Sequence, residues 1–315
     1  MTEKTEINKN IRQHAGSGRN SLSGGENIKL NENDAISISI RNVVKKYGNL
    51  YAVKDISFDV KKGEFFGFLG PNGAGKTTII RIITTSTKAT SGQVLVNGYD
   101  ITKEPIKAKK DIGVVSQYIN IDMELTCREN LIVHAMLHRM KKKEASERID
   151  FLLDYIEMTD KKNVLVEHIS GGMKRKLMIA RALLHEPDIL FLDEPTIGLD
   201  AHSKRKLWEL MSKINSENKT IFLTTHYIEE AEELCSRVGI IHEGQLIALD
   251  SPANLIKTVG SITLDVLEND MLKSYFFNSR EQALAGASKN EGTVVIRETN
   301  LEDVFLNKTG RRVES

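Results

Sequence analysis

Short apolar runs separated by polar turns recur along the chain and predict β-strands. Ile36, Ile38 and Ile40 alternate with polar residues, which is the two-residue period of a strand with one buried face. Similar runs predict further strands over 51–60, 65–69, 93–96, 112–115, 189–192, 220–224, 238–241 and 246–249. Helical patterns lie between many of these runs. This alternation of strands and helices predicts an α/β fold built on a doubly wound parallel sheet.

The segment from about 120 to 172 has a different pattern. Ile132, Met136 and Met140 recur at four-residue spacing, and the apolar positions of residues 151–156 follow the same period. This is the spacing of an apolar stripe along an α-helix. The sequence therefore predicts an all-helical insert within the α/β fold.

The two ends of the chain differ from its middle. Residues 1–34 are polar and cannot bury enough apolar surface to offset the entropy lost on ordering, so we expect a disordered tail. Residues 256–315 carry strand-like runs over 262–267 and 293–296 and predict a small C-terminal subdomain. The main domain is then expected to span 35–255.

Composition restricts the class of protein. Hydrophobic residues make up 40%, charged residues 28%, and the net charge is +1, so no overall field favours nucleic acid. Cys127 and Cys235 are far apart and lack metal-ligand spacing, which indicates reduced thiols. No apolar run reaches the roughly 18–20 residues that span a bilayer. We therefore expect a cytoplasmic protein whose membrane-spanning segments, if it acts at a membrane, belong to another subunit.

Residues 70–78 read Gly-Pro-Asn-Gly-Ala-Gly-Lys-Thr-Thr and stand between an apolar run and a helical pattern. This is a phosphate-binding P-loop in the strand–loop–helix context that the motif requires. Its glycines let backbone N–H groups point at phosphate oxygens, and the helix start adds a positive dipole end. Lys76 is expected to reach the β- and γ-phosphates, and the Thr77 hydroxyl to hold Mg²⁺. The predicted nucleotide contacts here are Asn72, Gly73, Gly75, Lys76, Thr77 and Thr78.

Two carboxylates, Asp193 and Glu194, end the apolar run 189–192. A buried strand that delivers acids beside a P-loop is the Walker B arrangement. Successive side chains of a strand point in opposite directions, so the two acids should have different roles. We assign Asp193 to Mg²⁺ and Glu194 to the attacking water as general base.

A second candidate anion site lies at Ser170, Gly171 and Gly172, which precede a long helical pattern. Two phosphate sites in one fold cannot both close on the same γ-phosphate unless two copies pair head to tail. The sequence therefore suggests a dimer as well as a nucleotide.

The order of these motifs resembles that of ATP-binding cassette (ABC) ATPases over about residues 36–250. The P-loop comes first, then Gln117, then the Ser-Gly-Gly signature ahead of Asp193, and finally Asp200 and His226. The resemblance implies a P-loop NTPase core with a parallel sheet, an antiparallel β subdomain, the helical insert and the C-terminal appendage. It also implies ATP and Mg²⁺ as ligands and a homodimer that sandwiches two ATP molecules.

The resemblance assigns roles residue by residue. Tyr47 matches the aromatic residue that stacks on adenine, a contact worth about 1–3 kcal/mol per base. Gln117 matches the glutamine that senses Mg²⁺ and water beside the transmembrane partner. Residues 170–172 match the signature that contacts the γ-phosphate held by the other copy. Asp200 matches the loop that crosses the dimer interface. His226 matches the switch histidine that holds the γ-phosphate and water. The catalytic set so implied is Lys76, Gln117, Glu194 and His226, and the metal set is Thr77, Gln117 and Asp193.

Two features refine the resemblance. The family's signature usually opens with Leu and ends with Gln, whereas this chain has Ile169 and Met173, so we expect altered affinity or rate rather than loss of function. Residues 300–306 with Thr309, Gly310 and Arg311 look similar to the ending of drug-resistance-type ABC ATPases. This favours the exporter branch, which acts at the cytoplasmic membrane face with separate transmembrane permease subunits.

Two alternatives remain beside the exporter subunit. One is a soluble ABC ATPase that acts on nucleic acid or ribosomes, although one uninterrupted cassette with near-neutral charge makes nucleic acid an unexpected partner. The other is a nucleotide-binding module without hydrolysis. The presence of Lys76, Asp193, Glu194 and His226 argues against it.

Overall fold

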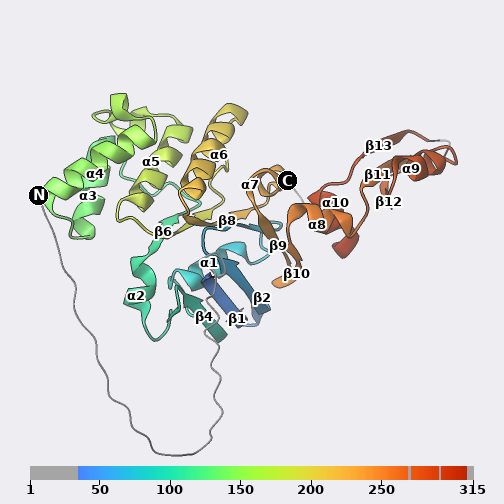
Figure 1. Ribbon diagram of the computed structural model, residues 1–315, viewed down its shortest axis with the longest axis horizontal. Helices are drawn as coiled ribbons and strands as arrows, with labels where there is room; N and C mark the ends of the chain where they lie inside the picture. The colour runs from blue at the N-terminus through green and yellow to red at the C-terminus, as the bar shows by residue number, and fades with distance from the viewer. Residues whose placement is uncertain (1–34, 269–270, 291, 311–315) are drawn as a thin grey trace, which may run out of the picture.

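A computed structural model describes residues 35–268, 271–290 and 292–310; the tail expected over 1–34, and Arg311, lie outside this range. At the centre is a six-stranded sheet in the order β10-β9-β3-β8-β7-β6 (Figure 1). Its strands are β3 (Phe65–Leu69), β6 (Ile112–Val115), β7 (Ile189–Asp193), β8 (Thr220–Thr225), β9 (Arg237–His242) and β10 (Gln245–Asp250). All neighbouring strands pair parallel except β10, which runs antiparallel to β9 at the edge. The predicted parallel sheet is confirmed.

Strand β7 shows why the central strands read as continuous apolar runs. Leu190 and Leu192 pack into the core on the side of the helical insert. Ile189 and Phe191 point to the opposite face and pack into a second core. Because layers cover both faces of the sheet, every position of the strand is buried, and no polar residue alternates with the apolar ones.

The second core joins the central sheet to an antiparallel sheet in the order β2-β1-β4-β5. These strands are β1 (Ile36–Tyr47), β2 (Leu50–Lys61), β4 (Ser91–Val96) and β5 (Tyr99–Asp100). Phe58 of β2 stacks on Phe66 of β3 with ring centroids 5.2 Å apart, and Phe222 of β8 lies 5.3 Å from Phe66. Helices α1 (Lys76–Ile83) and α2 (Pro105–Lys110) contribute to the same core. This aromatic cluster connects the two sheets beneath the P-loop.

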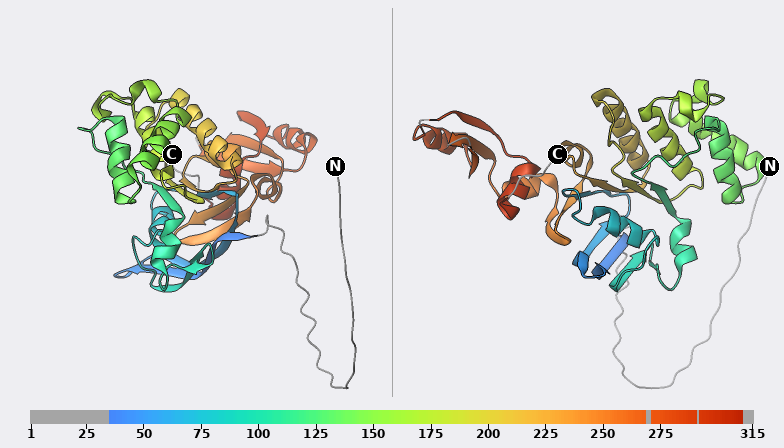
Figure 2. Two further views of the ribbon diagram at one scale, coloured as in Figure 1. Left: turned by 60° about the vertical axis from the view of Figure 1, so that its left-hand side comes forward. Right: turned by 180° about the vertical axis from the view of Figure 1, so that it is seen from behind.

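The helical insert covers the other face of the central sheet together with α6 (Ala201–Ser216), as Figures 1 and 2 show from three sides. It comprises α3 (Cys127–Leu137), α4 (Lys142–Tyr155) and the short 3₁₀ turns η2 (Thr159–Lys161) and η3 (Val166–His168), and it leads into α5 (Gly171–Leu183), most of which lies beyond the predicted insert. The predicted helical insert is confirmed, but its buried face differs from the expected stripe. The buried residues of α3 are Cys127, Asn130, Leu131 and Ala135, whereas Met136 is 70% exposed.

Two helices alternate with the central strands: α6 lies between β7 and β8, and α7 (Ile228–Leu234) between β8 and β9. After β10, α8 (Pro252–Lys257) leads into a three-stranded antiparallel sheet in the order β12-β11-β13. That sheet contains β11 (Ile262–Glu268), β12 (Met271–Phe277) and β13 (Val294–Glu298), with α9 (Arg280–Ala287) packed on it. In both figures it projects away from the rest of the molecule, while α10 (Leu301–Thr309) returns to pack against α7 and α8. The sequence pattern missed β12 and α9.

No helix in these described segments is both long enough and apolar enough to traverse a lipid bilayer.

Candidate functional site

The P-loop connects β3 to α1 and opens onto a cleft of about 620 Å³. Gly75 stands at the start of α1 with φ of +112°, and a Cβ there would lie 2.5 Å from the carbonyl oxygen of Ala52. Only glycine fits this position, because both the backbone conformation and the close approach exclude a side chain. The cleft is lined by every P-loop residue predicted to bind nucleotide, Asn72, Gly73, Gly75, Lys76, Thr77 and Thr78, and also by Gln117 and Glu194.

Lys76 and Glu194 form a buried ion pair in this cleft. Lys76 Nζ lies 3.1 Å from Glu194 Oε1, and the two side chains are only 4% and 5% exposed. The ammonium group also donates hydrogen bonds to the carbonyl oxygens of Gly70 at 2.8 Å and Pro71 at 3.0 Å. Each charge is therefore compensated in a place where an unpaired charge would be costly.

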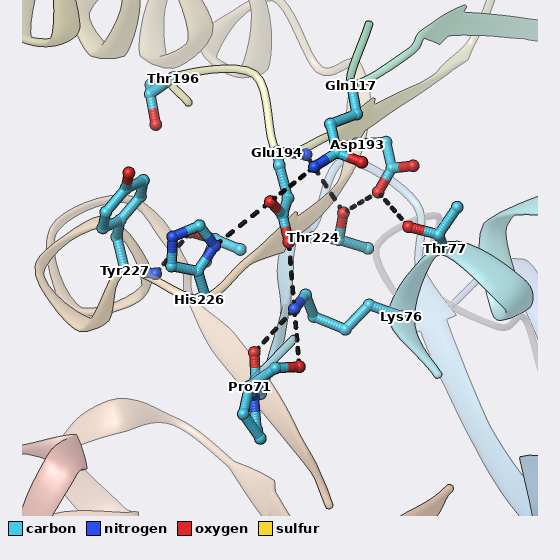
Figure 3. A network of polar contacts seen from close by, with 12 residues as sticks. Pro71, Lys76, Thr77, Gln117, Asp193, Glu194, Thr196, Thr224, His226 and Tyr227 are labelled. Carbon is cyan, nitrogen blue, oxygen red and sulfur yellow. Dashed lines mark hydrogen bonds and ion pairs between the residues drawn. The ribbon is translucent and has the colours of Figure 1, made fainter. Parts of the chain in front are cut away.

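Three side chains surround the Glu194 carboxylate (Figure 3). Lys76 faces Oε1, and Gln117 Nε2 donates a 3.2 Å hydrogen bond to Oε2. His226 Nδ1 also lies 3.2 Å from Oε2, but without the alignment of a hydrogen bond. The structure thus brings together the four side chains that the sequence analysis named as the catalytic set.

Asp193 has different partners, as its position on the strand predicts. Its Oδ1 accepts hydrogen bonds from Thr224 Oγ1 at 2.6 Å and Thr77 Oγ1 at 3.2 Å. Burial raises the pKa of Asp193, and these two hydrogen bonds oppose that effect. A carboxylate and a hydroxyl side by side are oxygen ligands of the kind that Mg²⁺ prefers, so Thr77 and Asp193 fit the predicted metal set.

Sequence reasoning missed two residues that hold this arrangement. Thr224 binds Asp193, and its hydroxyl also accepts a 3.3 Å hydrogen bond from the backbone N–H of Glu194. Arg175 of α5 is buried and donates to the carbonyl oxygens of Ser116 at 3.0 Å and Gln117 at 2.6 Å. The available signal for Arg175 was a basic residue on the otherwise apolar buried face of α5. Arg175 connects α5 to the Gln117 loop.

The signature lies at a separate cleft of about 310 Å³. Ser170 caps α5 by accepting a 3.3 Å hydrogen bond from the Met173 N–H, and Gly172 packs closely against Ser203. Ser203 in turn donates to Asp200, from its N–H at 2.9 Å and its hydroxyl at 2.7 Å. The signature and the Asp200 loop are therefore neighbours. The signature cleft shares no lining residue with the P-loop cleft.

The adenine contact is less defined than the phosphate contacts. Tyr47 is exposed and does not line the P-loop cleft, and the ammonium group of Lys45 lies over its ring, 4.6 Å from the ring centroid. Tyr51, four residues later, does line the cleft. Stacking of adenine on Tyr47 stays a prediction. Tyr51 is the aromatic residue that lines the cleft.

Comparison with known proteins identifies the family. A sequence model described as "ABC transporter" matches residues 53–197. The Nod factor export ATP-binding protein I of Rhizobium johnstonii is 38% identical over 300 residues, which cover 89% of this chain and 96% of the relative. This chain belongs to the ABC transporter family. The linearmycin resistance ATP-binding protein LnrL of Bacillus subtilis is 36% identical to this ABC cassette, with coverage of 87% and 98%.

Solved ABC cassettes share the fold. A dimeric, post-hydrolysis state of the cassette MJ0796 bound to ADP and Pi superposes with a TM-score of 0.61 at 31% identity, covering 68% of this chain and 98% of that one. CbiO1 of Clostridium perfringens, part of the complex cbiONQ, gives a TM-score of 0.66 at 26% identity, covering 71% and 92%. The chain is thus an ABC ATP-binding subunit, and its enzymatic activity is ATP hydrolysis.

Proposed function

We propose that this ABC subunit works as a head-to-tail homodimer that couples ATP hydrolysis to export through separate transmembrane subunits. The observation that supports the dimer is the separation of the two clefts. Within one copy the P-loop cleft contains no signature residue, so each ATP site is incomplete without Ser170–Gly172 of a second copy. Head-to-tail pairing completes two sites by one symmetry operation.

The side chains at the P-loop cleft divide the chemistry between them. A γ-phosphate would compete with Glu194 for Lys76, which leaves the carboxylate free to accept a proton from the attacking water. Water adds to the γ-phosphorus as the bond to the β-phosphate oxygen breaks. Gln117 and His226, which already lie against Glu194, are placed to orient that water and the phosphate. Mg²⁺, held by Thr77 and Asp193, would supply compensation for the phosphate charge.

An exposed apolar surface is the proposed docking site for the transmembrane partner. We define it as Tyr118 and Ile119, which follow Gln117, together with the outward face of α3 formed by Ile132, Val133, Met136 and Leu137. The two parts are joined because Asn130 of α3 donates to the Asp122 carbonyl at 2.9 Å and accepts from the Asp122 N–H at 2.8 Å. Exposed apolar groups that lie together mark interaction sites. Contact there would reach Gln117 directly and hence Glu194.

The direction of transport and the location are inferred from relatives. The names of two relatives report Nod factor export and linearmycin resistance, which support export as the direction for this subunit. With transmembrane partners, the subunit would act at the cytoplasmic face of the cell membrane. Action on nucleic acid or ribosomes receives no support from these relatives.

Mixing two inactive variants tests the composite site. Lys76→Ala removes the P-loop cation and Ser170→Arg blocks the signature, so each homodimer should lose ATP hydrolysis. In a mixed dimer one site combines the intact Lys76 and the intact Ser170, so random mixing should leave about a quarter of the composite sites intact. Phosphate release that stays at the level of the separate variants would overturn the proposal. As a control, mixing Lys76→Ala with Glu194→Gln should restore nothing, because both residues belong to the same half of the site.

A further inference from the structure

Three histidines gather away from both clefts. His134 lies in the last turn of α3, His138 caps the C-terminal end of that helix, and His185 follows α5. One ring nitrogen from each residue lies within 4.8 Å of the others. None of the three lines the P-loop cleft or the signature cleft, so ATP hydrolysis does not account for the cluster.

His185 shows the bonding pattern of a metal ligand. Its Nε2 lies 3.0 Å from the carbonyl oxygen of Ile112. A carbonyl only accepts hydrogen bonds, so Nε2 carries the proton and Nδ1 keeps its lone pair. Nδ1 is buried and has no hydrogen-bond partner. Metal-binding histidines commonly donate their other ring N–H to a backbone carbonyl, which fixes the tautomer and the orientation of the ring.

The other two imidazoles are placed to close on the same point. The rings of His138 and His185 stack with centroids 4.2 Å apart, and those of His134 and His138 are 4.8 Å apart. Zn–N bonds of about 2.0–2.1 Å in a tetrahedral site set the ligand nitrogens about 3.3 Å apart. The cluster therefore needs to contract. Contraction requires the exposed His138 ring to turn out of its stack on His185.

Burial and neighbouring charges act on the three imidazoles. Burial lowers the pKa of His134 to about 4 and also lowers those of His138 and His185. Arg181 adds to the effect on His134, although its guanidinium is engaged by Asn120. The adjoining cleft carries charges of both signs, from Lys109, Lys110, Arg148, Glu144 and Glu186.

We propose that His134, His138 and His185 bind one divalent transition-metal ion of the Zn²⁺ class. Three imidazoles suit Zn²⁺, Cu²⁺, Ni²⁺ and Co²⁺, and not the oxygen-seeking Mg²⁺ expected at Thr77 and Asp193. The bound ion would connect the end of α3 to the segment after α5, and through His185 to the start of β6. It would thereby restrain the helical insert against the central sheet.

The test uses the full chain without a polyhistidine tag and without nucleotide. Titration with Zn²⁺ by calorimetry, and with Co²⁺ by visible absorption, should show one ion bound per chain with a low-coordinate Co²⁺ spectrum. His138→Ala should weaken binding by at least about 100-fold, since loss of a ligand exceeds the 10–100-fold cost of losing an outer partner. The matched control is His168→Ala, which removes an exposed histidine elsewhere.

Thermal unfolding gives a second readout. Zn²⁺ should raise the unfolding temperature of the wild type and of His168→Ala, because an ion that binds only the folded state stabilises it. It should leave that of His138→Ala unchanged. Equal affinity in wild type and His138→Ala would place the ion elsewhere, and no binding at all would reduce the cluster to packed rings. Either result would overturn the proposed metal site. Neither result would bear on the proposed function of the ATP site.

Discussion

Glu194 has a backbone conformation that its residue type rarely adopts. Its φ is +46°, in the left-handed region that costs a non-glycine residue about 1–3 kcal/mol. The strain is tolerated because the Glu194 N–H donates to the Thr224 carbonyl at 3.0 Å and the side chain is held by Lys76. The consequence is a sharp turn away from β7 that aims the carboxylate at the P-loop cleft. A relaxed strand would not present Glu194 there.

Gly75→Ala should abolish ATP binding. The added Cβ would lie 2.5 Å from the Ala52 carbonyl oxygen at a φ of +112°, so the P-loop must shift to accommodate it. The matched control is Gly98→Ala, at a φ of +81° with nothing within 4 Å of the added Cβ. That control variant should lose about 1 kcal/mol of folding stability and keep its affinity for ATP. Binding of a fluorescent ATP analogue measures the difference, and equal affinity in both variants would contradict the prediction.

At the scale of elements, an ion-pair network joins α10 to the C-terminal sheet. Arg297 of β13 lies 2.6 Å from Asp303 of α10 and 2.8 Å from Asp265 of β11. Asp303 is almost fully buried, and its carboxylate also accepts from the Thr263 hydroxyl at 3.0 Å. Burial alone would raise the pKa of Asp303, but the hydrogen bonds from Arg297, the Asn300 N–H and Thr263, together with the Arg297 charge, outweigh it and the pKa is lowered. The network therefore stabilises the folded state while Asp303 is ionised.

Arg297→Ala should lower the free energy of unfolding by about 2–4 kcal/mol, because it leaves a buried carboxylate unpaired. Arg41→Ala, which breaks the exposed pair with Asp59, should cost less than about 1 kcal/mol. The folded pKa of Asp303 lies below its unfolded value of about 3.9, so the contribution is complete above that pH. It is lost as the pH falls through the folded pKa. Urea unfolding of both variants between neutral and acidic pH would show whether this acid dependence disappears with Arg297.

At the scale of the whole molecule, α5 connects the two halves of the proposed composite site. Its first residues belong to the signature, and Arg175 one turn later holds the Gln117 loop. Gln117 contacts Glu194. In the proposed dimer, contact between the signature and the ATP of a second copy can therefore act on Glu194, the proposed catalytic carboxylate, through one helix of its own copy. This gives the predicted dimer a route for communication between its sites.

Glu194→Gln should form dimers in the presence of Mg-ATP, because it retains the P-loop but lacks the proposed general base. Light scattering should show a monomer-to-dimer shift with Mg-ATP and none with ADP. Adding Ser170→Arg should abolish the shift, whereas Ser288→Arg, the same change at an exposed serine of the C-terminal subdomain, should preserve it. A shift that survives Ser170→Arg would show that the dimer does not use this signature. In that case the departure at Met173 would have no bearing on dimer formation.

Some features could not be found from sequence because their signals are not local. The apolar stripe of the insert was visible, but burial in α3 falls on Leu131 and Ala135 instead, since the packing of α4 and α5 selects the inner face. Strand β12 and helix α9 lack a strong period. His134 and His138 stand four residues apart, yet their pairing with His185 depends on how α3 packs beside α5.

The sequence by itself determined the central strands, the P-loop and the set of residues that we propose to bind phosphate or activate water. These follow from periodicity and spacing within a few residues, which the chain carries wherever it folds. Only the tertiary structure decided which of them meet. The parallel register of β7 and β8 sets Thr224 beside Asp193, and the turn after β7 directs Glu194 to Lys76. The separation of signature and P-loop was likewise decided by packing, because contacts between distant segments depend on the whole core.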